Sequence, residues 1–325
     1  MKKFICLILT LIFSIATLFI GCNSPATIRI YAPDGAPALA LSSVIKQDFE
    51  NAEICIVSAD KIGSLVSGKE KKADICILPI NMASKLIGNG EDYKTLGTVT
   101  HGNFYFLSRS ETVIDRENID RLIGKTVGVM QLQNVPGLTL QSVFINNAIE
   151  YTTIQDISEK EQHKVNLMAI NKIETARTDI DAFLIPSPQA DAIAQTTDLK
   201  FVGSLGELYG DFGFPQAIIV VKNQVLEKNL PLVKEFVKQL ESVENYLKEE
   251  NKAEICTLLR SKIESGLTPV FNENNLTSDS INRSKIKFIA CKNSKETMKT
   301  FIQKLKSVNP NSVGEFSEDF FYLGE

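Results

Sequence analysis

The stretch YAPDGAPALAL at residues 31–41 combines the end of a strand, a turn and the start of a helix. Residues 27–31 alternate as in a β-strand, and an apolar run after the turn extends through Ile45 and Phe49. Pro37 suits the first helical turn because its missing N–H would have no intrahelical partner there. This is either an ordinary strand-to-helix connection or one wall of a polar ligand site, since a helix start presents free N–H groups.

The rest of the chain repeats this alternation of short apolar runs and helix-like segments. Apolar strands separated by helices are typical of a covered, largely parallel sheet, which predicts an α/β protein. Strands are expected at 28–32, 53–57, 74–78, 94–100, 126–130, 182–185, 200–202, 217–221 and 286–289. Helices are expected at 38–49, 63–67, 81–87, 136–148, 225–247, 253–263 and 298–305.

The composition is that of an ordinary globular protein. The 325 residues are 44% hydrophobic and 23% charged, with a formal net charge of -4. This length suffices for one large or two medium domains, each with its own core. Nucleic acid is not an expected partner, because the chain has no basic block and no Arg interleaved with aromatic residues. No motif predicts a cofactor, and no Cys/His spacing predicts a metal site.

Residues 1–21 have the features of an export signal. A cationic start is followed by an apolar run from residue 4 to residue 20. The ending LFIGC resembles a bacterial lipobox, although Phe19 stands where leucine is usual. The resemblance implies lipidation of Cys22 and an extracytoplasmic protein anchored to the cell membrane at the surface or in the periplasm. An uncleaved membrane anchor is the alternative.

Four cysteines follow Cys22, namely Cys55, Cys76, Cys256 and Cys291. In an exported protein they could form two disulfides, and the sequence leaves the three possible pairings open. Cys55 and Cys76 each lie in an apolar run, so we expect them to be small core residues.

Several segments occur in an order that resembles a known family: YAPDGAPALAL (31–41), ADICILPINMASKL (73–86), LGTVTHGNFYFL (96–107), IGKTVGV (123–129), IPSPQA (185–190), FPQAIIVV (214–221) and NPNSVGEFSEDFFY (309–322). They resemble the solute-binding lipoproteins of ABC importers related to the nitrate/sulfonate/taurine type. The resemblance covers nearly all of the mature chain. It implies a monomeric protein with a small-molecule solute and an ABC permease with its ATPase as partners.

The resemblance also implies a type II periplasmic-binding-protein fold, in which two α/β lobes joined by two crossovers hold the ligand between them. Lobe one is then expected to comprise residues 27–104 and 217–325, and lobe two residues 105–216. The crossovers are expected near 103–109 and 214–217.

In open α/β sheets the ligand binds beyond the carboxyl ends of the strands. In lobe one this rule predicts ligand contacts from Asp34, Gly35, Ala36, Pro37, Asn81, His101 and Asn103. In lobe two and at the hinge it predicts contacts from Asn134, Gly137, Ser187, Gln189, Phe214 and Gln216.

Several of these residues also have structural alternatives. Asp34 either bonds the N–H groups of its own turn or pairs with a cationic or donor group of the ligand. Gly35 and Gly137 could serve backbone geometry, Asn81 a helix cap, and His101 a structural hydrogen bond.

The candidate loops contain no Arg or Lys, and Arg109 lies only at their margin. A small dianion is usually bound by a basic group in addition to helix N-termini. We therefore expect a neutral, zwitterionic or aromatic ligand. A planar one could stack on Tyr31, Phe104, Tyr105, Phe212 or Phe214.

An enzyme is the main alternative, because pyrimidine-forming and menaquinone-pathway enzymes use the same two-lobed fold. The chain has no Gly-x-Ser-x-Gly elbow, phosphate loop or metal-ligand cluster. A surface adhesin lipoprotein is a third possibility, but the expected repeats are absent. The sequence therefore predicts a non-enzymatic solute binder that closes about a hinge.

Overall fold

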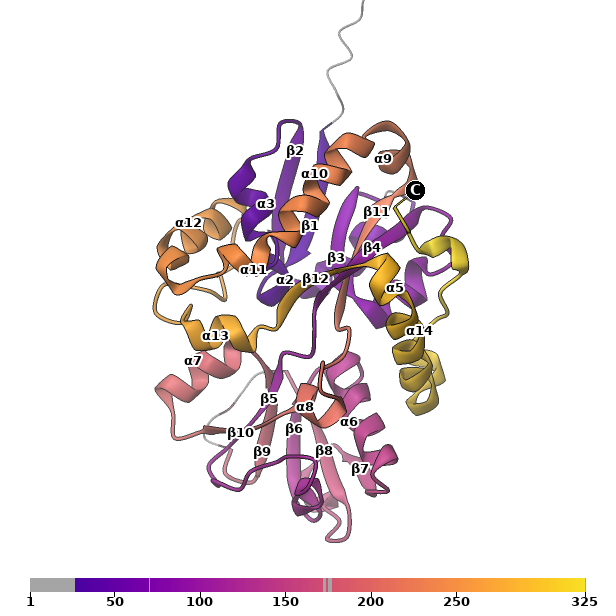
Figure 1. The fold of residues 1–325 in the computed structure, drawn as a ribbon. Helices are drawn as coiled ribbons and strands as arrows, with labels where there is room; N and C mark the ends of the chain where they lie inside the picture. Colours follow the sequence, from indigo (N-terminus) through magenta and orange to yellow (C-terminus); the bar gives the residue numbers. More distant parts are fainter. Residues whose placement is uncertain (1–26, 70, 172–173, 175–176, 325) are drawn as a thin grey trace, which may run out of the picture.

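The structure is a computed structural model that describes residues 27–324 except 70, 172–173 and 175–176. Figure 1 shows two lobes, each built on a β-sheet with helices packed on its faces. The expected export signal and Cys22 lie outside the described residues. Within the described part of the chain, no helix is long and apolar enough to cross a membrane.

The sheet of lobe one has six strands in the order β12-β4-β11-β3-β1-β2. β1 pairs in parallel with β2 and β3, whereas β11 runs antiparallel to β3 and β4. The strands are β1 Ile28–Pro33, β2 Ala52–Val57, β3 Ile75–Pro79, β4 Tyr93–Thr100, β11 Ala217–Lys222 and β12 Ile286–Ala290. The helices of this lobe include α2 Ala36–Leu39, α3 Ser42–Gln47, α4 Ile62–Val66, α5 Ile80–Ile87, α12 Lys252–Lys262 and α13 Ser278–Arg283.

The sheet of lobe two also has six strands, in the order β10-β5-β9-β6-β8-β7. β6 is parallel to β8 and β9, whereas β5 is antiparallel to β9 and β10. The strands are β5 Phe104–Ser108, β6 Thr126–Met130, β7 Tyr151–Ile154, β8 Val165–Ile170, β9 Ala182–Pro186 and β10 Lys200–Ser204. Helices α6 Val135–Asn146 and α7 Gln189–Thr196 follow β6 and β9.

Two crossovers connect the lobes. Residues 101–103 lead from β4 to β5, and residues 205–216, which include α8 Leu205–Tyr209, lead from β10 to β11. The predicted two-lobed α/β fold is confirmed. Each sheet is mixed rather than mostly parallel, because the strands next to the crossovers run antiparallel to their neighbours. The expected first crossover near 103–109 was placed too late, since Phe104 already begins β5 of the second sheet.

The prediction of one long helix at 225–247 is wrong. This segment is divided into α9 Asn223–Lys228, α10 Leu230–Glu241 and α11 Val243–Tyr246. Pro231 lies in the first turn of α10. Proline has no N–H and its ring clashes with the carbonyl four residues earlier, so a helix can begin there but cannot continue through it.

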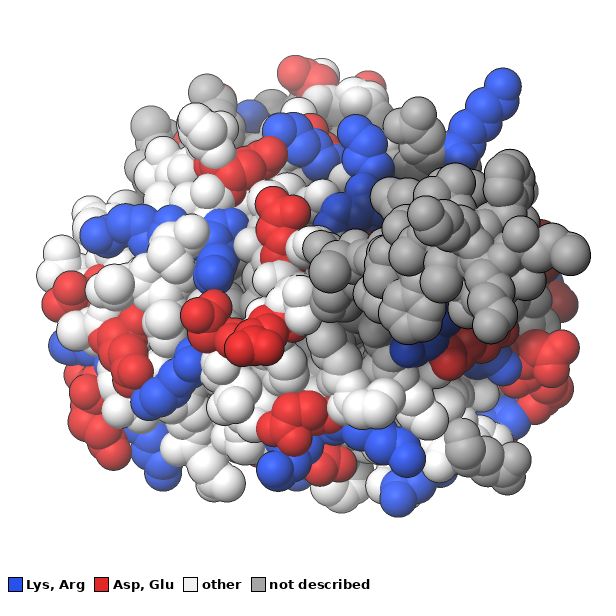
Figure 2. Space-filling view, turned by 90° about the horizontal axis from the view of Figure 1, so that it is seen from above, with Lys and Arg blue, Asp and Glu red and all other residues white. Residues whose placement is uncertain are grey.

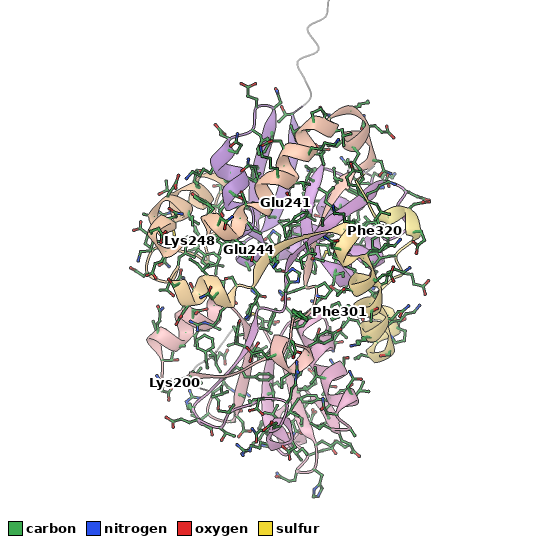
Figure 3. All side chains as sticks on the ribbon, viewed as in Figure 1. Lys200, Glu241, Glu244, Lys248, Phe301 and Phe320 are labelled. Carbon is green, nitrogen blue, oxygen red and sulfur yellow. The ribbon has the colours of Figure 1, made fainter. Side chains whose placement is uncertain are left out.

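The C-terminal helix α14 Cys291–Val308 packs against α6 of the other lobe. Phe301, labelled in Figure 3, is fully buried and stacks on Phe214 of the second crossover with ring centroids 5.3 Å apart. The apolar core around it includes Leu78 of lobe one and Phe144 of lobe two. One continuous core therefore joins the two lobes.

All four cysteines of the described chain are free. Cys76, Cys256 and Cys291 are buried, and Cys55 is partly buried beside the core. This confirms the expectation of a core residue for Cys76, whereas Cys55 lies at the edge of the core. None of these four cysteines forms a disulfide.

Candidate ligand site between the lobes

The turn after β1 is held by the carboxylate of Asp34. Its Oδ1 accepts a hydrogen bond from Gly35 N at 2.7 Å, and its Oδ2 accepts one from Val270 N at 2.8 Å. Burial raises the pKa of Asp34, and these two bonds partly offset the rise. Gly35 adopts a φ of 96°, which a side chain would disfavour, and the buried Ala36 and the partly exposed Pro37 open α2. One oxygen of Asp34 thus serves its own turn and the other ties that turn to residue 270, while a ligand contact stays a prediction.

Side chains from both lobes meet at the start of α5. The amide of Asn81 donates from Nδ2 to Oδ1 of Asn134, the residue before α6, at 3.5 Å. The backbone N–H of Ile80 donates to the carbonyl of Gln216 at 3.0 Å. Asn81 does not cap the helix, because α5 begins at Ile80 and Pro79 is its N-cap. Its side chain is instead free to reach across to lobe two.

The same contacts continue through the first crossover. Oε1 of Gln216 accepts from Asn103 N at 3.1 Å. The Nδ2 of Asn103 donates to the carbonyl of Ser187 at 2.7 Å, and Ser187 N donates to the carbonyl of Asn103 at 2.8 Å. Five predicted site residues therefore form two groups, one of Asn81 and Asn134 and the other of Asn103, Ser187 and Gln216. The bond from Ile80 to Gln216 links them, because Ile80 precedes Asn81. We call them the cleft network: Asn81, Asn103, Asn134, Ser187 and Gln216.

Buried polar atoms in and beside the cleft network lack partners. Within the part of the chain that the structure describes, no hydrogen bond reaches Asn81 Oδ1, Thr100 Oγ1, Asn103 Oδ1 or Gln189 Oε1. Asn81 is 5% exposed, Thr100 0% and Asn103 2%. A buried polar atom without a partner costs about 1–3 kcal/mol. Hydrogen bonds from a bound molecule to these atoms stay a prediction.

Two further predicted residues have roles in packing. Phe214 is 1% exposed and lies between the rings of Tyr209 and Phe301. Gly137 lies in the first turn of α6, where an added Cβ would come 2.0 Å from the carbonyl oxygen of Leu132. Only glycine allows that approach. For both residues a direct ligand contact stays a prediction.

His101 opens the first crossover and bonds to β12 rather than to the cleft network. Its Nε2 is 3.0 Å from the carbonyl of Lys287 on β12, and burial lowers its pKa. The ring lines a cavity of about 440 Å³ together with Glu207 and Lys285. The structural alternative for His101 is therefore realised, and its role toward a ligand is untested.

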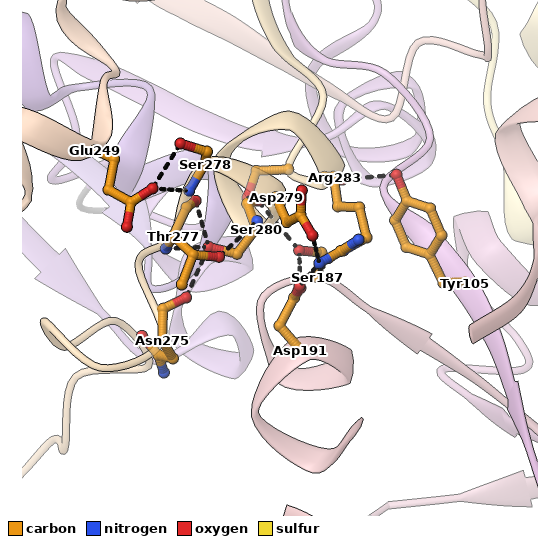
Figure 4. Close-up of polar contacts among 11 residues, drawn as sticks. Tyr105, Ser187, Asp191, Glu249, Asn275, Thr277, Ser278, Asp279, Ser280 and Arg283 are labelled. Atoms are coloured by element: carbon orange, nitrogen blue, oxygen red, sulfur yellow. Dashed lines mark hydrogen bonds and ion pairs between the residues drawn. The ribbon is translucent and has the colours of Figure 1, made fainter. Parts of the chain in front are cut away.

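A buried ion pair that the sequence did not predict adjoins the cleft network. Arg283 of α13 donates from Nε to Asp191 Oδ1 of α7 at 2.7 Å, and its Nη2 is 2.6 Å from the same oxygen. Ser187 Oγ donates to Asp191 Oδ2 at 2.5 Å, and Tyr105 donates to the carbonyl of Arg283 at 3.0 Å. Figure 4 shows these contacts, which we call the interlobe clasp: Tyr105, Ser187, Asp191 and Arg283. The clasp joins α13 of lobe one to α7 and β5 of lobe two.

Charges of both signs lie on the face of lobe one that is opposite lobe two. Figure 2 shows Lys and Arg interspersed with Asp and Glu over the face of lobe one seen from above. The described residues also contain no cluster of His, Cys, Asp and Glu suited to hold a metal ion.

Comparison with known proteins gives matches by structure alone. No family model and no curated protein matches the sequence. An ABC transporter structure from Parabacteroides distasonis matches with a TM-score of 0.71 at 16% identity, covering 92% of this chain and all (100%) of that one. The periplasmic aliphatic sulphonate binding protein of Escherichia coli matches with a TM-score of 0.61 at 12% identity, covering 91% of both chains. The fold is that of the periplasmic binding proteins.

The periplasmic nitrate-binding protein of Synechocystis PCC 6803 also matches, with a TM-score of 0.55 at 11% identity over 86% of this chain and 81% of that one. In this periplasmic-binding-protein fold the carboxyl ends of β1, β3, β6 and β9 point toward the junction of the lobes. That is where ligands of open α/β sheets bind. The cleft network lies at this position.

Proposed function

We propose that this protein is the extracytoplasmic solute-binding component of an ABC importer. The observation that carries the proposal is the cleft network, in which side chains from both lobes meet beside buried polar atoms that lack partners. The sulphonate- and nitrate-binding proteins of the same fold support it. The candidate contacts are Asp34, Gly35, Ala36, Pro37, Asn81, His101, Asn103, Asn134, Gly137, Ser187, Gln189, Phe214 and Gln216.

Binding works by closure of the lobes about residues 101–103 and 205–216. In the open form the solute contacts one lobe, and contacts from the other lobe then favour the closed form. Asn81 and Asn134 illustrate the principle, because their hydrogen bond exists only while α5 and the turn before α6 are close. The closed protein delivers its solute to the permease, and the lipid on Cys22 keeps the monomer near the membrane.

A binding protein and an enzyme make different demands on the site. Acid–base or nucleophilic catalysis needs a titratable group within hydrogen-bond reach of the substrate. The cleft network instead consists of side-chain amides and the backbone of Ser187, which bind without exchanging protons at neutral pH. The titratable candidates Asp34 and His101 are both bonded to backbone groups of the protein. We therefore assign the site to reversible capture rather than to a reaction.

The direct test is to look for a bound molecule. The full chain is purified from its bacterial host without unfolding and analysed by native mass spectrometry. We expect a small molecule that leaves with the denatured protein and, when returned to ligand-free protein, reduces the radius of gyration in X-ray scattering. A chain that carries and accepts no small molecule from a complete metabolite extract would refute the proposal.

A further inference from the structure

On the basis of the proposed solute-binding function, we infer that the cleft network takes a neutral molecule with N–H or O–H donors rather than an oxyanion. The carbonyl oxygens of Asn81, Asn103 and Gln189 accept the hydrogen bonds of that molecule. This narrows the ligand class beyond neutral, zwitterionic or aromatic, and it separates this protein from the sulphonate- and nitrate-binding proteins of the same fold.

The orientation of the Asn103 amide is set by the protein. Its Nδ2 donates to the carbonyl of Ser187 at 2.7 Å, and a carbonyl oxygen can only accept. The other end of the amide must therefore be Oδ1, which is buried and has no partner within the described chain. Asn103 is 2% exposed, so water access is small. This position is a fixed acceptor that only a donor can satisfy.

Asn81 and Gln189 present further acceptors on opposite sides of the junction. In the orientation in which Nδ2 donates to Asn134, Asn81 leaves Oδ1 buried and unpartnered within the described chain. Gln189 opens α7 two residues after Ser187, and its Oε1 is likewise buried and unpartnered. The hydroxyl of Thr100 adds a group that can donate or accept. Lone pairs on these oxygens attract N–H and O–H groups and repel an oxyanion.

The charges around the cleft network offer no compensation for an anion. The turns at 33–37, 79–81, 100–103, 131–137, 186–189 and 213–216 contain no Arg or Lys. Arg283 comes close through the interlobe clasp, but Asp191 pairs with its guanidinium at 2.6 Å. Bound oxyanions usually require a cationic side chain as well as helix N-termini.

A cationic or stacked aromatic ligand is also poorly matched. Asp34 is the one acidic residue in these turns, and each of its oxygens accepts a backbone N–H of lobe one. Four of the five aromatic candidates are engaged by the protein: Phe214 packs against Phe301, Tyr105 bonds Arg283, Phe104 is 2% exposed, and Tyr31 packs partly buried against the apolar core. Phe212 is 96% exposed. What remains is a neutral polar molecule recognised through its donors.

The first experiment identifies the molecule that accompanies the full chain. Accurate mass and fragmentation of the released compound give its functional groups. We expect a compound that is neutral at pH 7 and carries at least one N–H or O–H donor. Recovery of nitrate, sulfate, a sulfonate or a phosphate ester would overturn this inference and leave solute binding intact. Recovery of no compound from a complete metabolite extract would overturn the proposed function and the inference together.

The second experiment changes the charge of the acceptor at Asn81. Asn81→Asp keeps an acceptor oxygen and adds negative charge, whereas Asn81→Leu removes the acceptor. Both variants lose the bond from Asn81 Nδ2 to Asn134, so for the recovered compound calorimetry should give about tenfold or tighter binding to Asn81→Asp than to Asn81→Leu. An aspartate variant that binds more weakly than the leucine variant would overturn the inference, because only an anion is repelled by the added charge. Asn146→Asp, at the far end of α6 from Asn134, is the matched charge control.

Discussion

Replacing Asp191 by Asn tests whether the interlobe clasp holds the two lobes together. The Asp191 side chain is 2% exposed and receives Arg283 Nε at 2.7 Å and Ser187 Oγ at 2.5 Å. Asparagine keeps the size of the side chain but removes its charge. Arg283 then retains one carboxylate, that of Asp279 at 3.5 Å.

The structure sets the expected magnitude. Removing one partner of a buried ion pair costs about 3–5 kcal/mol because the other charge is left unpaired. The side chain of Arg283 is 27% exposed and Asp279 remains, so solvent and that carboxylate recover part of the loss. We expect the free energy of unfolding to fall by about 2 kcal/mol. If the clasp opens when the lobes part, apparent ligand affinity falls by up to about 30-fold.

A double-mutant cycle separates the pair from its surroundings. Guanidinium unfolding of Asp191→Asn, Arg283→Met and the double variant should give a coupling energy of about 1 kcal/mol or more. Asp279→Asn is the matched control, since its carboxylate also contacts Arg283 but is 76% exposed. That variant should stay within about 0.5 kcal/mol of the wild type. A coupling energy below about 0.3 kcal/mol, which distant independent sites show, would refute the reasoning.

Three further predictions concern other parts of the molecule. Phe301→Ala should lower the free energy of unfolding by about 3–5 kcal/mol, because the ring is fully buried between Tyr209 and Phe214, whereas Phe212→Ala, at 96% exposure, should change it by less than about 0.5 kcal/mol. His101 should make the protein less stable in acid, because burial lowers its pKa in the folded state. As pH falls below the ordinary value of 6.5, the unfolded chain therefore binds the proton first. The stabilisation that is present above that value is lost as pH falls through the folded-state pKa. Unfolding measured at pH 7.5 and pH 5 should show that His101→Asn reduces the difference between the two free energies of unfolding. Cys22→Ser should abolish incorporation of an alkyne-labelled fatty acid in bacterial cells, and labelling that persists would place the lipid elsewhere.

The strands that the sequence predicted correctly have a local cause. Runs such as 75–79 and 217–222 are apolar on both faces because helices cover both sides of the sheet. β5 was assigned to a crossover because its sequence, FYFLS, suits an extended connection as well as a strand. What makes it a strand is antiparallel pairing with β9 and β10, which lie far along the chain. Pairing between strands that are distant in the chain leaves no pattern in the local sequence from which it could be predicted.

The same distinction applies to the site. The turns at strand ends could be predicted, because topology alone brings carboxyl ends of strands to one junction. The network linking Asn81 to Asn134 then follows from the approach of the lobes. Asp191 and Arg283 could not be predicted, since they are 92 residues apart and each lies on an unremarkable helix. Only the packing of α13 against α7 makes them partners.

Ser187 connects the two arrangements. Its backbone is bonded to Asn103 in the cleft network, and its hydroxyl is bonded to Asp191 in the interlobe clasp. A ligand that bonds Asn103 therefore restrains a residue on which the clasp depends, and an intact clasp positions Ser187 and the Gln189 turn for the ligand. Two interactions that stabilise the same closed arrangement must reinforce each other to an equal degree, by thermodynamic linkage. The free energy of ligand binding that Asp191→Asn loses should thus equal the free energy by which the bound ligand stabilises the clasp in the wild type.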